Sequence, residues 1–140
     1  MLIDEDVAEP FVAMPVHLLP THEITSVRAR GWSGKKDVPL YADAAKRGFN
    51  VMVSANHHQL QIPDEVRAIR KSKMHVAHYE QADGLSGLGR TAGGLPAAIG
   101  PVIDELDSAS GQLFVRIPCI SARKRHEVTD PRNNPPKYWT

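Results

Sequence analysis

The first six residues of the chain place a short apolar segment, residues 1–3, directly before three acids, Asp4, Glu5 and Asp6. This pattern predicts a β-strand that delivers the acids at its carboxyl end. In an open α/β sheet, ligands bind outside the carboxyl ends of the strands, and carboxylates placed there can hold a divalent cation. The start of the chain therefore predicts an α/β sheet that carries a metal-dependent site.

Strand and helix patterns alternate along the remaining sequence. β-branched and apolar residues predict further strands over 22–27, 49–54, 74–78 and 112–117. Apolar residues at three- and four-residue steps predict a helix over 7–18 that ends near Pro15 to Pro20, and others over 37–47, 63–69 and 96–108, the last bent at Gly100-Pro101. The glycine-rich passage 84–94 predicts a loop. Strands and helices that alternate at this spacing predict a mostly parallel sheet covered on both faces.

Length and composition limit the class of protein. The chain has 140 residues and 41% hydrophobic content, which is enough for one domain with a single core. Its net charge of +1 neither requires nor excludes a nucleic-acid partner. The single cysteine, Cys119, excludes an intramolecular disulfide and fits a reducing compartment. With no leader pattern and no apolar run of about 20 residues, we expect a cytoplasmic protein without a membrane partner.

Three groups of polar residues fall at predicted strand ends or at the start of the helix that follows a strand. They are Asp4 with Glu5 and Asp6, then Asp37, then Ser54 and Asn56. The right-handed crossover rule favours neighbouring positions for the first and third strands, so these groups would meet in one acidic pocket. Such a pocket suits phosphodiester hydrolysis with Mg²⁺ or Mn²⁺, which activates water and stabilises the leaving oxygen. Alternatively, Asp37 is only a first-turn helix acid and Asp6 only an N-cap.

Basic residues surround the second predicted loop, next to Asp37. They are Arg28, Arg30, Lys35 and Lys36, and Arg90 lies in the later glycine-rich passage. Charge neutralisation supplies much of the affinity for a phosphate backbone, so these side chains are candidate RNA contacts. A solvated surface is the alternative. From residue 118 the composition changes to a basic, proline-containing tail, which we expect to pack on a partner or stay mobile.

Three segments, taken in order and with their spacing, resemble the compact PIN-like domain proteins, relatives of PIN-domain toxin ribonucleases. They are 2–7, 27–34 followed by Asp37 and an alanine-rich helix, and 48–54. The resemblance covers residues 1–117 and leaves 118–140 as the tail. It implies a three-layer α/β/α sandwich, metal-dependent ribonuclease activity, and a role as the toxin of a toxin–antitoxin pair. The implied partners are a cognate antitoxin and RNA, with a homodimer as a further possibility.

The same resemblance assigns roles to the candidate residues. Asp4 matches the first metal-ligand aspartate of the family, and Asp37 matches the acid at the start of the second helix. Asp6 would be a further ligand, with Glu5 and Ser54 in support. The family commonly has an aspartate two residues after a threonine that ends the third strand, and this sequence has Ser54 and Asn56 there.

That departure leaves alternatives open. Asparagine offers a neutral carbonyl oxygen, and the lost charge weakens the binding of a hard cation. A catalytically degenerate PIN-like module that binds protein or nucleic acid without cleavage is therefore the second hypothesis. His57 and His58 could supply a nitrogen ligand instead, which would shift preference toward Mn²⁺ or Zn²⁺. The run Gly87–Ala92 weakly fits a dinucleotide fingerprint, and a small nucleotide-binding protein is the third hypothesis.

Overall fold

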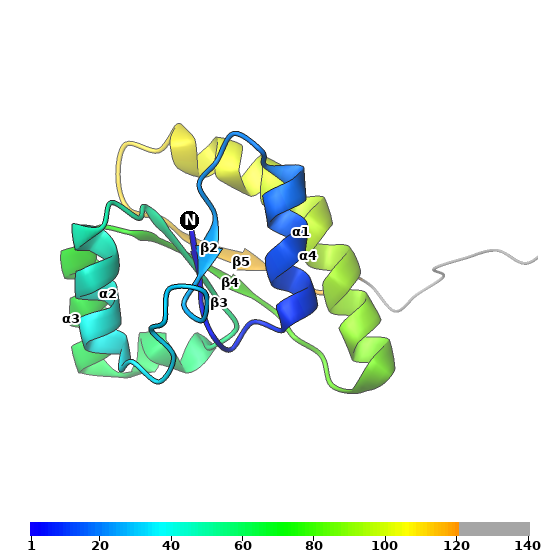
Figure 1. The fold of residues 1–140 in the computed structure, drawn as a ribbon, viewed down its shortest axis with the longest axis horizontal. Helices are drawn as coiled ribbons and strands as arrows, with labels where there is room; N and C mark the ends of the chain where they lie inside the picture. The colour runs from blue at the N-terminus through cyan, green and yellow to red at the C-terminus, as the bar shows by residue number, and fades with distance from the viewer. Residues whose placement is uncertain (121–140) are drawn as a thin grey trace, which may run out of the picture.

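The computed structural model describes residues 1–120, which form an α/β domain (Figure 1). In chain order its elements are β1 (Leu2–Ile3), α1 (Glu9–Leu18), β2 (Thr25–Ser26), α2 (Asp37–Lys46), β3 (Val51–Ser54), the 3₁₀-helix η1 (His57–Gln61), α3 (Pro63–Ser72), β4 (His75–Tyr79), α4 (Gly84–Asp107) and β5 (Phe114–Ile117).

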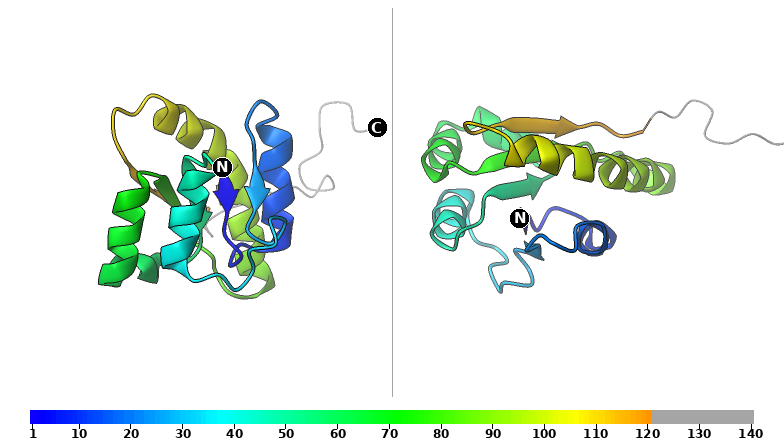
Figure 2. Two further views of the ribbon diagram at one scale, coloured as in Figure 1. Left: turned by 60° about the vertical axis from the view of Figure 1, so that its left-hand side comes forward. Right: turned by 90° about the horizontal axis from the view of Figure 1, so that it is seen from above.

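The five strands form one sheet in the order β2-β1-β3-β4-β5, and every neighbouring pair is parallel. Leu2 pairs with Met52 and Val51 pairs with His75. This confirms the α/β class and the adjacency of the first and third strands. Helices α1 and α4 lie on one face of the sheet and α2 and α3 on the other, as both views show (Figures 1 and 2), an arrangement compatible with three layers.

The buried core has two halves because successive side chains of a strand point to opposite faces. Leu2, Met52 and Val76 pack with α2 and α3, in a cluster that includes Leu40, Tyr41 and Ile69. Ile3, Val53 and Ala77 pack with α1 and α4, in a cluster that includes Phe11, Leu95 and Ile99. Asp4, Ser54 and His78 continue the first alternation, so the carboxyl edge of the sheet presents polar side chains on the side of α2 and α3.

The loop predicted over 84–94 is wrong, because these residues form the first half of α4. The glycines of this half allow close packing: a Cβ atom at Gly94 would lie 2.7 Å from the carbonyl oxygen of Pro118. The weak dinucleotide pattern is therefore a helix surface on which the chain packs after β5. Pro96 and Pro101 lie inside the helix, which changes direction where its colour turns to yellow (Figure 1).

Other element boundaries also differ from the predictions. The second strand is shorter than 22–27, whereas α1 ends at Leu18, within the predicted window between Pro15 and Pro20. No helix in the described part of the chain is both long enough and apolar enough to cross a membrane. Residues 121–140, which hold most of the predicted basic tail, lie outside the described residues.

Candidate active site at the carboxyl edge of the sheet

Asp4 is the buried acid of this edge. It follows β1 directly, and its backbone N–H donates to the carbonyl oxygen of Val53 over 2.8 Å, so the β1–β3 ladder fixes its position. The residue is only 7% exposed, and its Oδ1 atom accepts a 2.8 Å hydrogen bond from the backbone N–H of Glu5. The chain thus places a carboxylate at the centre of the sheet edge, where little water reaches it.

The environment of Asp4 disfavours its charge. Burial raises the pKa of Asp4 to about 6, repulsion from Asp6 and Asp37 adds to the rise, and hydrogen bonds from Glu5 and Ser54 oppose it. Asp37, the first residue of α2, behaves alike: burial raises its pKa to about 6, with Glu65 the next largest cause. When acids repel one another in a partly buried site, the binding of protons or of a cation is favoured, because either one neutralises their charge.

Glu65 is a site residue that the sequence reasoning missed. It lies in the first turn of α3, where an acid is ordinarily explained by the helix dipole. In the structure it lies close enough to Asp37 to raise the pKa of that carboxyl, and its Oε2 atom is buried without a hydrogen-bond partner among residues 1–120. Glu65 is four residues before the buried Ile69, so both lie on the inward face of α3. That spacing was the available indication.

Gln59 and Tyr41 form a buried hydrogen-bonded pair near Asp37. Both side chains are almost fully buried, and the Tyr41 hydroxyl donates to Oε1 of Gln59 over 3.0 Å. The Gln59 side chain lowers the pKa of the Asp37 carboxyl against the larger effects that raise it. A buried glutamine in η1 therefore lies close to an acid that begins α2, a proximity between elements that no local pattern predicts.

Asp6 is held by the end of β3. Its Oδ2 accepts a 3.0 Å hydrogen bond from the Ser54 hydroxyl, and both carboxylate oxygens accept from the backbone N–H of Ala55 at 3.1 and 3.2 Å. Asp4, Asp6 and Asp37 thus lie near enough to repel one another, and Ser54 contacts Asp6. Ser54 acts here as the donor that orients Asp6.

Two predicted site residues have other bonds. Asn56 precedes η1, and its Oδ1 atom accepts from the backbone N–H of His58 over 3.1 Å, which caps that helix. The Glu5 carboxylate accepts from the N–H of Gly34 at 3.1 and 3.2 Å and fastens the loop before α2. Both side chains therefore organise loops around the site.

A cavity of about 420 Å³ opens beside Asp37. Its lining contains both acidic and basic side chains. The acids are Glu5, Asp37 and Glu65, the bases are Lys35 and Lys36, and Gly34 and Val38 complete the lining. Lys36 precedes α2 and is exposed to solvent. Lys35 instead pairs with Asp43, and its Nζ atom lies 4.8 Å from the centre of the Trp32 ring. The cavity thus places Lys35 and Lys36 beside Asp37 and Glu65, while Asp4 and Asp6 lie outside its lining.

The other predicted RNA-binding residues, Arg28, Arg30 and Arg90, already contact other parts of the protein. Arg28 pairs with Glu9 over 3.1 Å, and the Arg30 guanidinium lies 5.5 Å from the centre of the Trp32 ring. The Nε atom of Arg90, on α4, donates to the carbonyl oxygen of Ile120 over 3.1 Å, which fastens the chain that follows β5. Arg28 and Arg30 flank the loop next to the cavity, while Arg90 has a structural contact in a helix.

The donor set of this edge is made of oxygen atoms, the ligand type that Mg²⁺ and Mn²⁺ prefer. Within residues 1–120, no three His, Cys, Asp or Glu side chains are arranged as a ready metal cage. Mg²⁺ usually keeps several waters and binds through only one or two carboxylates, so it does not need such a cage. The residues therefore fit a hydrated hard cation on Asp4 or Asp37.

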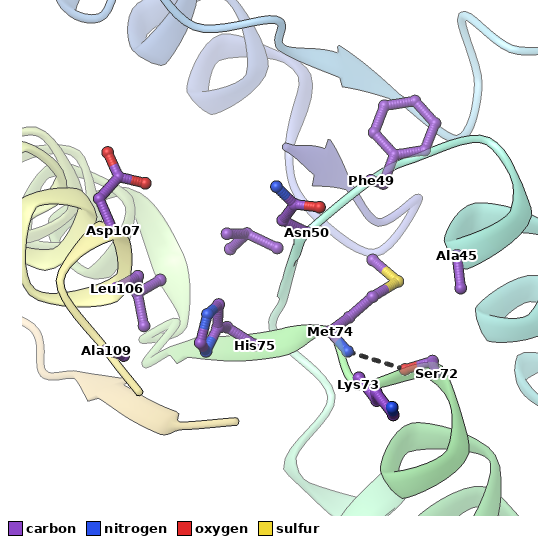
Figure 3. Close-up of a pocket in the computed structure, with 11 residues that line it drawn as sticks. Ala45, Phe49, Asn50, Ser72, Lys73, Met74, His75, Leu106, Asp107 and Ala109 are labelled. Atoms are coloured by element: carbon purple, nitrogen blue, oxygen red, sulfur yellow. Dashed lines mark hydrogen bonds between the residues drawn. The ribbon is translucent and has the colours of Figure 1, made fainter. Parts of the chain in front are cut away.

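A second cavity, of about 390 Å³, lies at the opposite edge of the sheet (Figure 3). Asn50, Met74 and His75, at the amino ends of β3 and β4, contribute to its lining. Parallel sheets bind ligands at the carboxyl ends of their strands, and this cavity contains no cluster of acids. The edge with Asp4 is thus the better candidate.

Comparisons with known proteins give no relative for this chain. No family model matches it, and neither the curated proteins nor the solved structures contain a match. The PIN-like resemblance consequently remains a prediction from the residues of the three segments.

The raised pKa values predict how stability depends on pH. Between the ordinary pKa of 3.8 and the folded value of about 6, the folded protein holds protons on Asp4 and Asp37 that the unfolded chain releases. The free energy of unfolding contributed by these two acids therefore falls as pH rises through this range and stays low above it. Urea denaturation at a series of pH values measures this fall.

The control for this prediction is the variant Asp4→Asn/Asp37→Asn. The lowered pKa of His78 acts in the opposite direction over part of the range, so the difference between wild type and variant isolates the acids. A constant difference between pH 4 and pH 7 would contradict the prediction.

Proposed function

We propose that this protein is a metal-dependent ribonuclease of PIN-like type. The observation that carries the proposal is the cluster of Asp4, Asp6, Asp37 and Glu65 at the carboxyl edge of an all-parallel sheet, with the pKa values of two of these acids raised to about 6. Uncompensated acids in a partly buried site are expected where a cation binds in the working protein.

The surroundings support a phosphate-containing substrate. The cavity beside Asp37 has Lys35 and Lys36 in its lining, and Arg28 and Arg30 lie on the loop that leads into it. Basic side chains beside the acids can neutralise the backbone of RNA and bring a scissile phosphate toward the carboxylates. Trp32 is partly covered by Lys35 and Arg30, so its main contribution is to hold these cations.

The residues divide the chemistry between them. Asp4 and Asp37 would hold Mg²⁺ or Mn²⁺, which when bound lowers the pKa of a coordinated water and stabilises the leaving oxygen. Asp6, oriented by Ser54, adds negative charge near Asp4. Gln59 lowers the pKa of Asp37 and so favours its charged form, and Glu65 is a base close to Asp37. Lys35 and Lys36 would bind the phosphate.

The biological role follows from the resemblance to PIN-domain toxins. As the toxin of a toxin–antitoxin pair, the protein would act on cytoplasmic RNA and be silenced by a cognate antitoxin, as a monomer or a homodimer. A gene for a small DNA-binding protein beside this one would support that role.

A second candidate is a catalytically degenerate PIN-like module that binds without cutting. The Asn56 side chain favours it, because a neutral amide used as a helix cap stands where the family commonly has an acid. This module would keep the basic rim and bind RNA or protein.

One variant distinguishes the two candidates. Asn56→Asp restores the charge and keeps a good capping residue, so it should fold normally. If the end of β3 borders the metal, the variant should bind Mn²⁺ roughly tenfold more tightly, by calorimetry, and cleave single-stranded RNA faster. Wild type should cleave with Mn²⁺ and stop when the metal is chelated.

Asn50→Asp is the matched control, because it adds the same charge at the exposed amino end of β3. Equal gains in both variants would show a general charge effect. Cleavage by neither wild type nor Asn56→Asp, together with retained RNA binding, would favour the degenerate module over the ribonuclease.

A further inference from the structure

His78 is a buried histidine with an unused ring nitrogen. It lies near the end of β4, pairs in register with Ser54 and is 4% exposed. Its Nε2 atom is buried and has no hydrogen-bond partner among residues 1–120. A buried polar atom without a partner is costly, so its retention calls for an explanation.

A second histidine, His57, lies against His78. The ring of His57, the first residue of η1, lies against the ring of His78 with the centroids 5.4 Å apart and the planes at 67°. His57 is exposed, so its ring can turn to admit an ion. The sequence suggested His57 together with its neighbour His58, whereas the fold places it against a histidine of β4.

The separation of the two rings fits a shared metal ion. With metal–nitrogen bonds of about 2.0 Å and a tetrahedral angle, two imidazoles on one ion have centroids roughly 5 Å apart. The two rings are thus about as close as two imidazoles that share one ion.

The electrostatic setting agrees with this geometry. Burial lowers the pKa of His78, the proximity of His57 lowers it further, and Asp6 opposes both effects. His78 is therefore neutral at neutral pH, which is the form that binds metal. The Asp6 carboxylate supplies negative charge close to the pair.

We propose that His57 and His78 form a binding site for a first-row transition cation of the Zn²⁺ class, separate from the carboxylates that would hold Mg²⁺ or Mn²⁺. Imidazole is a ligand that Zn²⁺, Cu²⁺ and Ni²⁺ prefer and that Mg²⁺ does not. Water would complete the coordination, since residues 1–120 offer no third ready ligand. The proposal is independent of ribonuclease activity.

The test is calorimetric titration of the full chain with Zn²⁺ alone. His57→Ala should weaken the binding of one equivalent by at least about tenfold. The matched control is His58→Ala, which removes the adjacent exposed imidazole and should leave that affinity unchanged. Asp4→Asn should also leave it unchanged, which separates this site from the acids.

A second measurement avoids dependence on one variant. Zn²⁺ should shift the ring resonances of His57 and His78 together in NMR spectra, at the same metal concentration. Equal loss of affinity in His57→Ala and His58→Ala, unchanged affinity in His57→Ala, or no binding by wild type would each overturn the proposal.

Discussion

Replacing Asp4 by asparagine is expected to lower metal-dependent cleavage of single-stranded RNA by about 100-fold or more, a loss of about 3 kcal/mol of transition-state stabilisation. Asparagine keeps the shape of the side chain but removes the charge that would hold the cation. It also removes a buried charge that Asp6 and Asp37 repel, so the melting temperature without metal should rise, by about 4 °C.

Fluorescent-substrate cleavage and thermal denaturation of the same preparations measure both effects. Asp104→Asn is the control, because Asp104 is an exposed acid on α4 and its loss changes net charge equally. If wild type and Asp4→Asn cleave equally, the activity belongs to a contaminant. If the melting temperature falls instead, Asp4 is a structural acid.

Replacing Glu65 by glutamine should have the second largest effect. The change removes the main charged group that raises the pKa of Asp37, so that pKa should fall from about 6 toward 3.8. Cleavage should fall about tenfold or more if Glu65 acts as a base or holds a metal-bound water. Measurement of the cleavage rate against pH, together with NMR titration of Asp37, follows both quantities.

Asp64→Asn is the matched control for Glu65→Gln. Asp64 is the neighbouring acid of the same helix turn, but it is exposed and pairs with Arg67. This variant should leave the pKa of Asp37 and the cleavage rate unchanged. An unchanged pKa of Asp37 in Glu65→Gln would mean that the two carboxyls do not interact in solution.

The sheet and its edge were predictable because they depend on local patterns. Alternating strands and helices indicated parallel pairing, and an apolar segment followed by acids indicated the edge where Asp4 lies. Asp37 was found because it begins a helix directly after a loop, a position that the spacing of apolar residues marks well. These predictions depended only on patterns within short, continuous stretches of the sequence.

The passage 84–94 shows where local patterns fail. Glycine lowers helix propensity, so five glycines in eleven residues favoured a loop. The structure uses Gly94 for close contact with the chain after β5, and this packing stabilises the helix despite the propensity. Helix stability in proteins comes mostly from tertiary packing, which a sequence window does not contain.

By itself the sequence determined the α/β class, the position of Asp4 at the carboxyl edge and the basic character of the loop before α2. Only the tertiary structure decided that Glu65 and Gln59 lie close to Asp37 and that the ring of His57 lies against that of His78. The physical reason is that a strand or helix period determines which face a side chain occupies, while the packing of separate elements determines which side chains from distant parts of the chain meet there.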